Sequence, residues 1–210
     1  MNQFQSIIDA LLACDQEQTT TLVKAALDNG ANADEILNQG LIAGMDIVGE
    51  RMESGDMFIP EVLMAAQAMN AAVEILKPLL SEEDAAAKGR VVIGTVKGDL
   101  HDIGKNLVAM MMGSAGLEVT DLGVDIAPEK FIEAVKDKKA NILCMSALLT
   151  TTMPMMKQTI EVVTQNGLRD RIKIMVGGAP VTQAYADEIK ADAYAPDAGT
   201  AAKTAKALLR

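Results

Sequence analysis

The feature that most constrains the fold is a change of hydrophobic periodicity near residue 90. From Arg90 onward, short apolar runs rich in β-branched residues alternate with amphipathic stretches of helical period. Strands that alternate with helices predict a parallel sheet covered on both faces. We therefore expect residues 90–210 to form an α/β domain with a five-stranded, doubly wound sheet of the Rossmann or flavodoxin type.

Each expected strand is followed by an expected helix. The strands are the runs VVIGTV, LEVTDLG, NILCMSAL, IKIMVGG and ADAYAP. The helices cover residues 103–114, 128–138, 154–165, 180–190 and 199–209.

The first eighty residues show a different pattern. Apolar residues recur at intervals of three and four in stripes that begin at Phe4, Leu22, Leu37 and Ile59, as expected of amphipathic helices. Pro60 suits the first turn of the last helix, and the run DNG (28–30) predicts the end of the second. We predict a four-helix bundle over residues 1–80, with Leu63 and Met69 in its core, and a polar linker over residues 81–89.

Composition excludes several classes of function. The net charge is −10 and basic runs are absent, which argues against binding to nucleic acid or anionic membranes. The N-terminus lacks the pattern of a signal peptide, and no segment holds ~20 uninterrupted apolar residues. The two cysteines, Cys14 and Cys144, suggest neither a disulfide framework nor a thiolate metal site. We expect a protein of the reducing cytoplasm.

Three loops should meet at the carboxyl-terminal edge of the sheet, where ligands of doubly wound sheets bind. They are KGDLHDIG after the first strand, SALLTTTMP after the third and GGAP after the fourth. Each also has a structural explanation, since Thr151 or Thr152 suits a helix N-cap and glycine suits a turn.

His101 is the only histidine in the chain, and Asp99 stands two residues before it. A metal-ligating imidazole commonly gives its second nitrogen to a carboxylate. A hydrolytic metal site would need about three protein ligands, so a lone histidine better suits a metal that a macrocycle already holds. Loops of the P-loop, dinucleotide-binding and nucleophile-elbow types are absent. A Mg²⁺ site built from Asp99, Asp102 and Asp125 stays open as an alternative.

The three motifs together resemble the cobalamin-binding signature Asp-x-His-x-x-Gly, Ser-x-Leu and Gly-Gly. They match at Asp99, His101 and Gly104, at Ser146 and Leu148, and at Gly177 and Gly178. The stretch ESGDMFIPEVLMAAQAM (53–69) is similar to the cap helix of cobalamin-dependent methionine synthase and of small corrinoid proteins. The resemblance therefore covers nearly the whole chain.

The resemblance implies a role for each matched residue. His101 would ligate cobalt from below, with Asp99 and then Thr152 behind it in a hydrogen-bonded chain. The cofactor-binding set would be Asp99, His101, Asp102, Ile103, Gly104, Ser146, Leu148, Thr150, Gly177, Gly178, Phe58, Met64 and Ala68. Within this set, Ser146 and Thr150 would contact the nucleotide tail of the cofactor and the glycines would leave room for it. Phe58 and the stretch 64–68 would cover the upper face of the corrin ring, on a cap that must swing to admit the methyl donor.

The resemblance also implies a function. The chain would be a corrinoid methyl carrier, not an enzyme alone, which accepts a methyl group on the Co(I) state of a His-ligated cobalamin. A substrate-specific methyltransferase would load it, a second methyltransferase would deliver the methyl group to a folate or thiol acceptor, and a reductive activator would restore Co(I). A cobalamin-binding mutase subunit, a corrinoid sensor and a flavodoxin-like Mg²⁺ module remain alternatives.

Overall fold

The computed structural model describes residues 3–80 and 89–209. The chain divides into two compact units, a helical one and one built around a β-sheet. The expected linker over residues 81–89 lies outside the described residues except for Gly89.

The helical unit contains the four amphipathic segments expected from the sequence. They are α1 (Gln5–Leu12), α2 (Gln16–Asp28), the continuous series α3 (Ala33–Glu35), η1 (Ile36–Ile42) and α4 (Ala43–Ser54), and α5 (Ile59–Leu76), which runs on into η2 (Lys77–Leu79). α2 ends at Asp28, and Pro60 lies in the first turn of α5, so both predicted helix boundaries are confirmed. The third segment was expected as one regular helix, whereas its centre, η1, is a π-helix.

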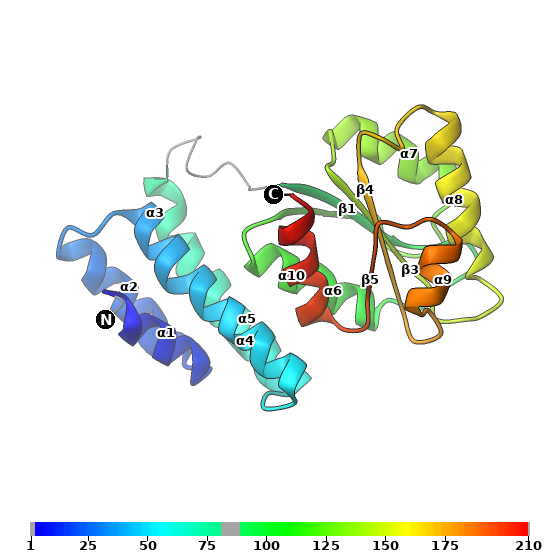
Figure 1. The fold of residues 1–210 in the computed structure, drawn as a ribbon. Helices are drawn as coiled ribbons and strands as arrows, with labels where there is room; N and C mark the ends of the chain where they lie inside the picture. Colours follow the sequence, from blue (N-terminus) through cyan, green and yellow to red (C-terminus); the bar gives the residue numbers. More distant parts are fainter. Residues whose placement is uncertain (1–2, 81–88, 210) are drawn as a thin grey trace. The chain divides into compact units, whose positions relative to one another are not determined.

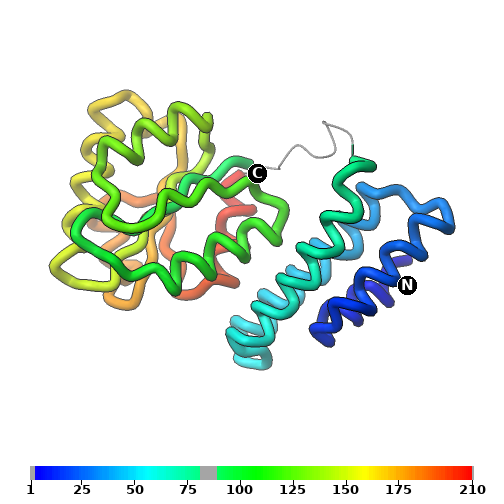
Figure 2. The backbone as a smooth tube through the Cα atoms, turned by 180° about the vertical axis from the view of Figure 1, so that it is seen from behind, coloured from blue at the N-terminus to red at the C-terminus, as the bar shows by residue number. Residues whose placement is uncertain are grey.

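The helices of this unit pack around α1 and α5. α2 lies along α5, and α1 contacts both α2 and α4 (Figure 2). Gly40 and Gly44 allow close approach to α1, since a Cβ on either would lie 3.3 Å from Phe4 or 3.1 Å from Leu11. Met69 is buried as predicted, but the prediction for Leu63 is wrong, because 39% of its surface is exposed.

The segment Ile59–Leu79 is the one helix among the described residues that is long and apolar enough to cross a membrane. Its residues Val62, Ala66, Met69 and Leu76 are buried. Because α5 packs along α2 in the bundle, we assign it as the core helix of this unit.

The sheet unit has the predicted five-stranded parallel sheet (Figure 1). Its strands are β1 (Arg90–Thr95), β2 (Glu118–Asp121), β3 (Ile142–Ser146), β4 (Lys173–Gly177) and β5 (Ala193–Ala195). Their order is β2-β1-β3-β4-β5, and every pairing is parallel. The connection direction reverses between β1 and β3, which is where such sheets place their ligands.

Helices cover both faces of the sheet. They are α6 (Ile103–Ser114), α7 (Pro128–Lys138), α8 (Pro154–Gln165), α9 (Gln183–Glu188) and α10 (Ala198–Leu208). α6 and α10 lie on one face, and α7, α8 and α9 on the other (Figure 1). On the second face, alternate strand residues such as Val92, Leu143 and Ile174 pack against Phe131 and Met156, in the period of two that strands impose.

Two local predictions in this unit are wrong. α9 begins at Gln183 and not at Pro180, because the extended Thr182 caps it by accepting a hydrogen bond from Tyr185 N. Neither Thr151 nor Thr152 caps α8, whose N-cap position is Met153. The hydroxyl of Thr152 has another partner, described next.

Candidate functional site

The three loops singled out in the sequence follow β1, β3 and β4, which are adjacent strands of the sheet. β1 and β3 run in register, with Thr95 beside Ser146, and Ser146 in turn pairs with Gly177 of β4. The loop after β1 carries Asp99 and His101, and the loop after β3 carries Leu148 and Thr152. The two loops therefore meet at the point where the connection direction reverses.

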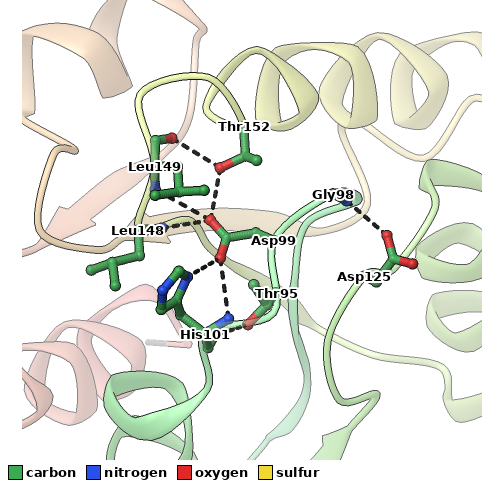
Figure 3. A network of polar contacts seen from close by, with 8 residues as sticks. All are labelled: Thr95, Gly98, Asp99, His101, Asp125, Leu148, Leu149 and Thr152. Carbon is green, nitrogen blue, oxygen red and sulfur yellow. Dashed lines mark hydrogen bonds and ion pairs between the residues drawn. The ribbon is translucent and has the colours of Figure 1, made fainter.

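The carboxylate of Asp99 is the centre of this site (Figure 3). Its Oδ1 accepts hydrogen bonds from His101 Nδ1 at 2.7 Å and from His101 N at 3.2 Å. Its Oδ2 accepts from Leu148 N at 2.8 Å, Leu149 N at 3.3 Å and Thr152 Oγ1 at 2.7 Å. The side chain of Asp99 is fully buried, so these donors replace the water that a carboxylate would otherwise bind.

The hydrogen bonds fix the charge of Asp99. Burial alone would raise the pKa of the carboxyl group, but hydrogen bonds from Thr152, His101 and Leu148 outweigh burial and hold the pKa of Asp99 well below its ordinary value. Asp99 is therefore a carboxylate that only accepts hydrogen bonds. The hydroxyl of Thr152 has a single proton, which it donates either to Asp99 or to the carbonyl of Leu149 at 2.9 Å.

The anionic Asp99 also fixes the tautomer of His101. A neutral imidazole facing this carboxylate carries its proton on Nδ1, so Nε2 keeps a free lone pair. No described residue makes a hydrogen bond to Nε2, and 51% of the side chain of His101 is exposed. The site thus presents one oriented nitrogen ligand to the solvent.

Large exposed apolar side chains lie close to His101 in sequence or on the loop after β3 that contacts Asp99. They are Leu100, Ile103, Leu148 and Leu149, with exposed fractions of 71, 82, 42 and 42%. Exposed apolar patches on a protein surface often mark a ligand-binding or interaction site. The arrangement suits a wide, largely apolar ligand that carries a metal open to one axial nitrogen.

The structure argues against the magnesium alternative. Both oxygens of Asp99 are occupied by protein donors, and Asp125 Oδ1 accepts from Gly98 N at 2.7 Å. Within residues 3–80 and 89–209, no three His, Cys, Asp or Glu side chains cluster closely enough to hold a metal ion.

Comparison with known proteins decides between the remaining interpretations. A family model described as B12 binding domain matches residues 89–209, and a second model with the same description matches residues 3–77. The dimethylamine corrinoid protein of Methanosarcina barkeri is 47% identical over 206 residues, which cover 98% of this chain and 96% of that one. The chain belongs to the family of B12-binding corrinoid proteins.

Other relatives agree with this assignment. The trimethylamine corrinoid protein 1 of Methanosarcina acetivorans is 43% identical over 96% of this chain and 94% of its own length. A cobalamin-binding protein from Desulfitobacterium hafniense superposes with a TM-score of 0.85 at 30% identity, covering 99% of both chains. A methanol:cobalamin methyltransferase complex from Methanosarcina barkeri gives a TM-score of 0.83 at 31% identity, covering 97% of this chain and 78% of that one.

The residues present fit a corrinoid. His101 Nε2 is free and oriented, and the exposed leucines and Ile103 suit the apolar face of a corrin macrocycle. Gly104, in the first turn of α6, has nothing within 4 Å of where a Cβ would lie, so the space that the nucleotide tail would need is open there. Ser146 is half-buried at the end of β3, and Asp102 and Thr150 are exposed on the loops of the site.

The cap residues of this corrinoid protein divide into two groups. Phe58 and Met64 are exposed at 69 and 50%, whereas Ala68 is fully buried. Ile59 and Leu63 extend the exposed group, with 48 and 39% of their surfaces accessible. Phe58, Ile59, Leu63 and Met64 thus form an apolar surface at the start of α5.

The three glycines of the family motif differ in what they do. A Cβ on Gly178 would lie 1.9 Å from the carbonyl oxygen of Ala147, and its φ of +124° is one that side chains disfavour. At Gly177 the nearest atom, Ala195 O, would be 3.0 Å away. The fold therefore requires glycine at position 178, because a side chain there would clash with the backbone. At Gly104 the fold imposes no such requirement.

Exchange of these glycines for alanine should separate the two roles. Gly178→Ala should lower the free energy of unfolding by ~3 kcal/mol or more, because the clash is with backbone and the φ angle is strained. Gly104→Ala should leave stability unchanged or raise it by up to ~1 kcal/mol, since alanine is the better helix former, while weakening corrinoid binding. Urea unfolding of the apo protein and titration with hydroxocobalamin measure the two effects. Equal stability of the two variants would contradict this assignment.

Sequence reasoning did not assign Thr95 or Leu149 to the site, and it considered Asp125 only as a ligand of the alternative Mg²⁺ site. Leu149 acts through its backbone N–H, which side-chain identity does not reveal. Thr95 donates from Oγ1 to His101 O at 2.8 Å. The one sequence signal that could have placed Thr95 in the site was a hydroxyl residue at the end of an apolar strand. Asp125 comes from the loop after β2, and its contact depends on strand order.

Proposed function

We propose that this corrinoid protein is a methyl carrier in which His101 would ligate the cobalt of a bound cobalamin or related corrinoid. The observation that carries the proposal is the Asp99–His101 pair, with Nδ1 held at 2.7 Å from Asp99 Oδ1 and Nε2 without a hydrogen bond to any described residue. The bound cofactor would supply a cobalt centre that accepts a methyl group and gives it up again.

The residues of the chain would support this chemistry in distinct ways. His101 supplies the ligand nitrogen, Asp99 orients the ring and raises its basicity, and Thr152 holds Asp99. Ser146, Thr150 and Gly104 line the route of the nucleotide tail. That Phe58 and Met64 would cover the cofactor stays a prediction from the sequence, and both side chains are exposed, whereas the buried Ala68 has no surface to offer.

Transfer of the methyl group needs partners, because a carrier alone neither selects a donor nor an acceptor. We infer that a substrate-specific methyltransferase loads the protein, that a second one unloads it to a folate or thiol acceptor, and that a reductive activator maintains it. The curated relatives are named for dimethylamine and trimethylamine, which supports a methylamine as the original donor.

The free thiols of Cys14 and Cys144 support a reducing cytoplasmic setting.

The single histidine makes the central test specific. Protein grown with ¹⁵N-histidine carries that isotope in side chains only at His101. After reconstitution with cob(II)alamin, nitrogen ligation by His101 should change the superhyperfine splitting of the electron paramagnetic resonance spectrum from a triplet to a doublet. A triplet in the labelled protein would show that the cofactor keeps its own base and would overturn the proposed ligation. The same preparation, reduced and offered to methylamine-specific and methanol-specific methyltransferases, tests the donor.

A further inference from the structure

The loop that carries His101 is held by contacts that lie outside the family motif. Thr95, fully buried at the end of β1, donates from Oγ1 to the carbonyl of His101 at 2.8 Å. Asp125 accepts from Gly98 N through Oδ1 at 2.7 Å and donates from its own N to Asp99 O at 3.0 Å. We call these three contacts the loop clamp, and Figure 3 shows the two that involve the side chains of Thr95 and Asp125.

The clamp contacts both ends of the segment Gly98–His101, which carries the imidazole of His101. Gly98 and Asp99 are fixed from the side of β2, and His101 is fixed from β1 beneath it. The loop after β2 lies close enough to do this because it continues beside β1, with Ile126 bridging to Val96 and Thr95 N bonded to Gly123 O. The segment Gly98–His101 therefore has little freedom to turn.

Asp125 adopts a backbone conformation that marks it as a constrained position. Its φ is +56°, in the left-handed region that few residues other than glycine, asparagine and aspartate tolerate. This conformation directs the N–H of Asp125 to Asp99 O and its carboxylate to Gly98 N. Strain of this kind persists where the surrounding contacts outweigh its cost.

We propose that Thr95 and Asp125 are positioning residues that set the reach and direction of the His101 imidazole toward cobalt. The side chain of Asp99 ties this loop to the loop after β3, and the clamp adds ties from the backbone of the same loop to the end of β1 and to the loop after β2. The position of the ligand is therefore set by three neighbouring segments of the sheet unit. The part of this inference that concerns cobalt rests on the proposed function.

The test compares variants that remove or keep each contact. Asp125→Ala and Asp125→Gly both remove the acceptor, and the glycine variant also relieves the left-handed strain. Asp125→Asn keeps an oxygen acceptor and tolerates the same φ. Thr95→Val removes the hydroxyl at nearly constant volume, and Thr95→Ser restores it. Lys139→Gly is the matched control, because Lys139 also has a positive φ, of 49°, but precedes β3 at the opposite edge of the sheet.

The first measurement needs no cofactor. Labelling with ¹⁵N-histidine gives a single backbone amide signal, that of His101, whose N–H is held by Asp99 Oδ1. Hydrogen exchange of this amide should be about tenfold faster in Asp125→Ala, Asp125→Gly and Thr95→Val. Asp125→Asn, Thr95→Ser and Lys139→Gly should stay within about twofold of the unmodified protein. Global stability, from urea unfolding, corrects the rates for any general loosening.

The second measurement titrates the protein with cob(II)alamin at one fixed pH and records the fraction of cobalt that shows the doublet. Removal of a supporting contact should weaken ligation about tenfold, and Asp125→Asn and Thr95→Ser should restore it. If the unmodified protein ligates cobalt and the clamp variants match it in both measurements, the inference is wrong. If the unmodified protein shows no doublet, the proposed function fails, and the exchange rates alone decide whether the clamp exists.

Discussion

Replacing His101 with alanine should abolish nitrogen ligation by the protein. No other histidine can substitute for it, because the chain contains one. Loss of residues that merely support a metal ligand commonly costs 10- to 100-fold in affinity or activity, so loss of the ligand itself should reduce methyl-group acceptance by more than ~100-fold. The measurement is the rate of cofactor methylation by a partner methyltransferase, together with the resonance spectrum of the Co(II) state.

Chemical rescue provides the control for this variant. The side chain of His101 is half-exposed, so free imidazole can reach the space that alanine leaves. Added imidazole should restore part of the nitrogen splitting and part of the rate. A variant that binds the cofactor in the same coordination as the unmodified protein, without imidazole, would contradict the assigned role of His101.

Removing Asp99 should have the largest effect on stability. Asp99→Ala leaves the N–H groups of Leu148 and Leu149 and the hydroxyl of Thr152 without their shared acceptor in the interior. We expect the free energy of unfolding to fall by ~3–5 kcal/mol, as when one member of a buried polar network is deleted. Asp99→Asn should lower the free energy of unfolding by about 2 kcal/mol. The NH₂ group of asparagine would replace one oxygen of the carboxylate and would then face a donor instead of accepting from it.

The effect of Asp99 on stability should also depend on pH. Because its pKa is lower in the folded than in the unfolded state, where it is ~3.9, the carboxylate stabilises the fold fully above about pH 5. This contribution is lost as the pH falls through the folded-state value. The stability difference between the unmodified protein and Asp99→Asn should therefore shrink steadily below ~pH 4.

A neighbouring aspartate offers a matched control. Asp102 is exposed, and its carboxylate accepts a hydrogen bond from Asn106 Nδ2 at 3.1 Å. Asp102→Asn should change the free energy of unfolding by less than ~0.5 kcal/mol across the same pH range. Urea titrations at a series of pH values compare the three proteins. A constant gap between the unmodified protein and Asp99→Asn down to the lowest pH at which the fold persists would contradict the assigned charge.

Local patterns predicted the parts of the fold and site that depend on neighbours in sequence. The alternation of strands and helices gave the sheet, and the spacing of Asp99 and His101 was enough to place the two side chains within hydrogen-bonding reach. The resemblance to corrinoid proteins added Thr152, whose bond to Asp99 spans 53 residues. Periodicity alone carries no information at that range.

The remaining features were beyond sequence reasoning for physical reasons. Asp125 reaches Gly98 only because β2 lies beside β1, and that order is a property of the assembled sheet. The sequence offers two possible starts for α9, because threonine is a good N-cap and proline suits the first turn of a helix. In the structure Thr182 is the N-cap and α9 begins after it. The π-helix η1 preserves the general spacing of apolar residues, so its hydrophobic stripe resembles that of a regular helix.

The bonds that join Asp99 to Leu148, Leu149 and Thr152 close loops of 49, 50 and 53 residues. Contacts of such long separation form late, after β1 and β3 have docked, because the chain entropy of closing the loop is lost before the bonds are gained. A nascent or misfolded chain therefore has no fixed imidazole to offer. If His101 ligates cobalt as proposed, capture of the cofactor requires paired central strands and would distinguish mature chains from immature ones.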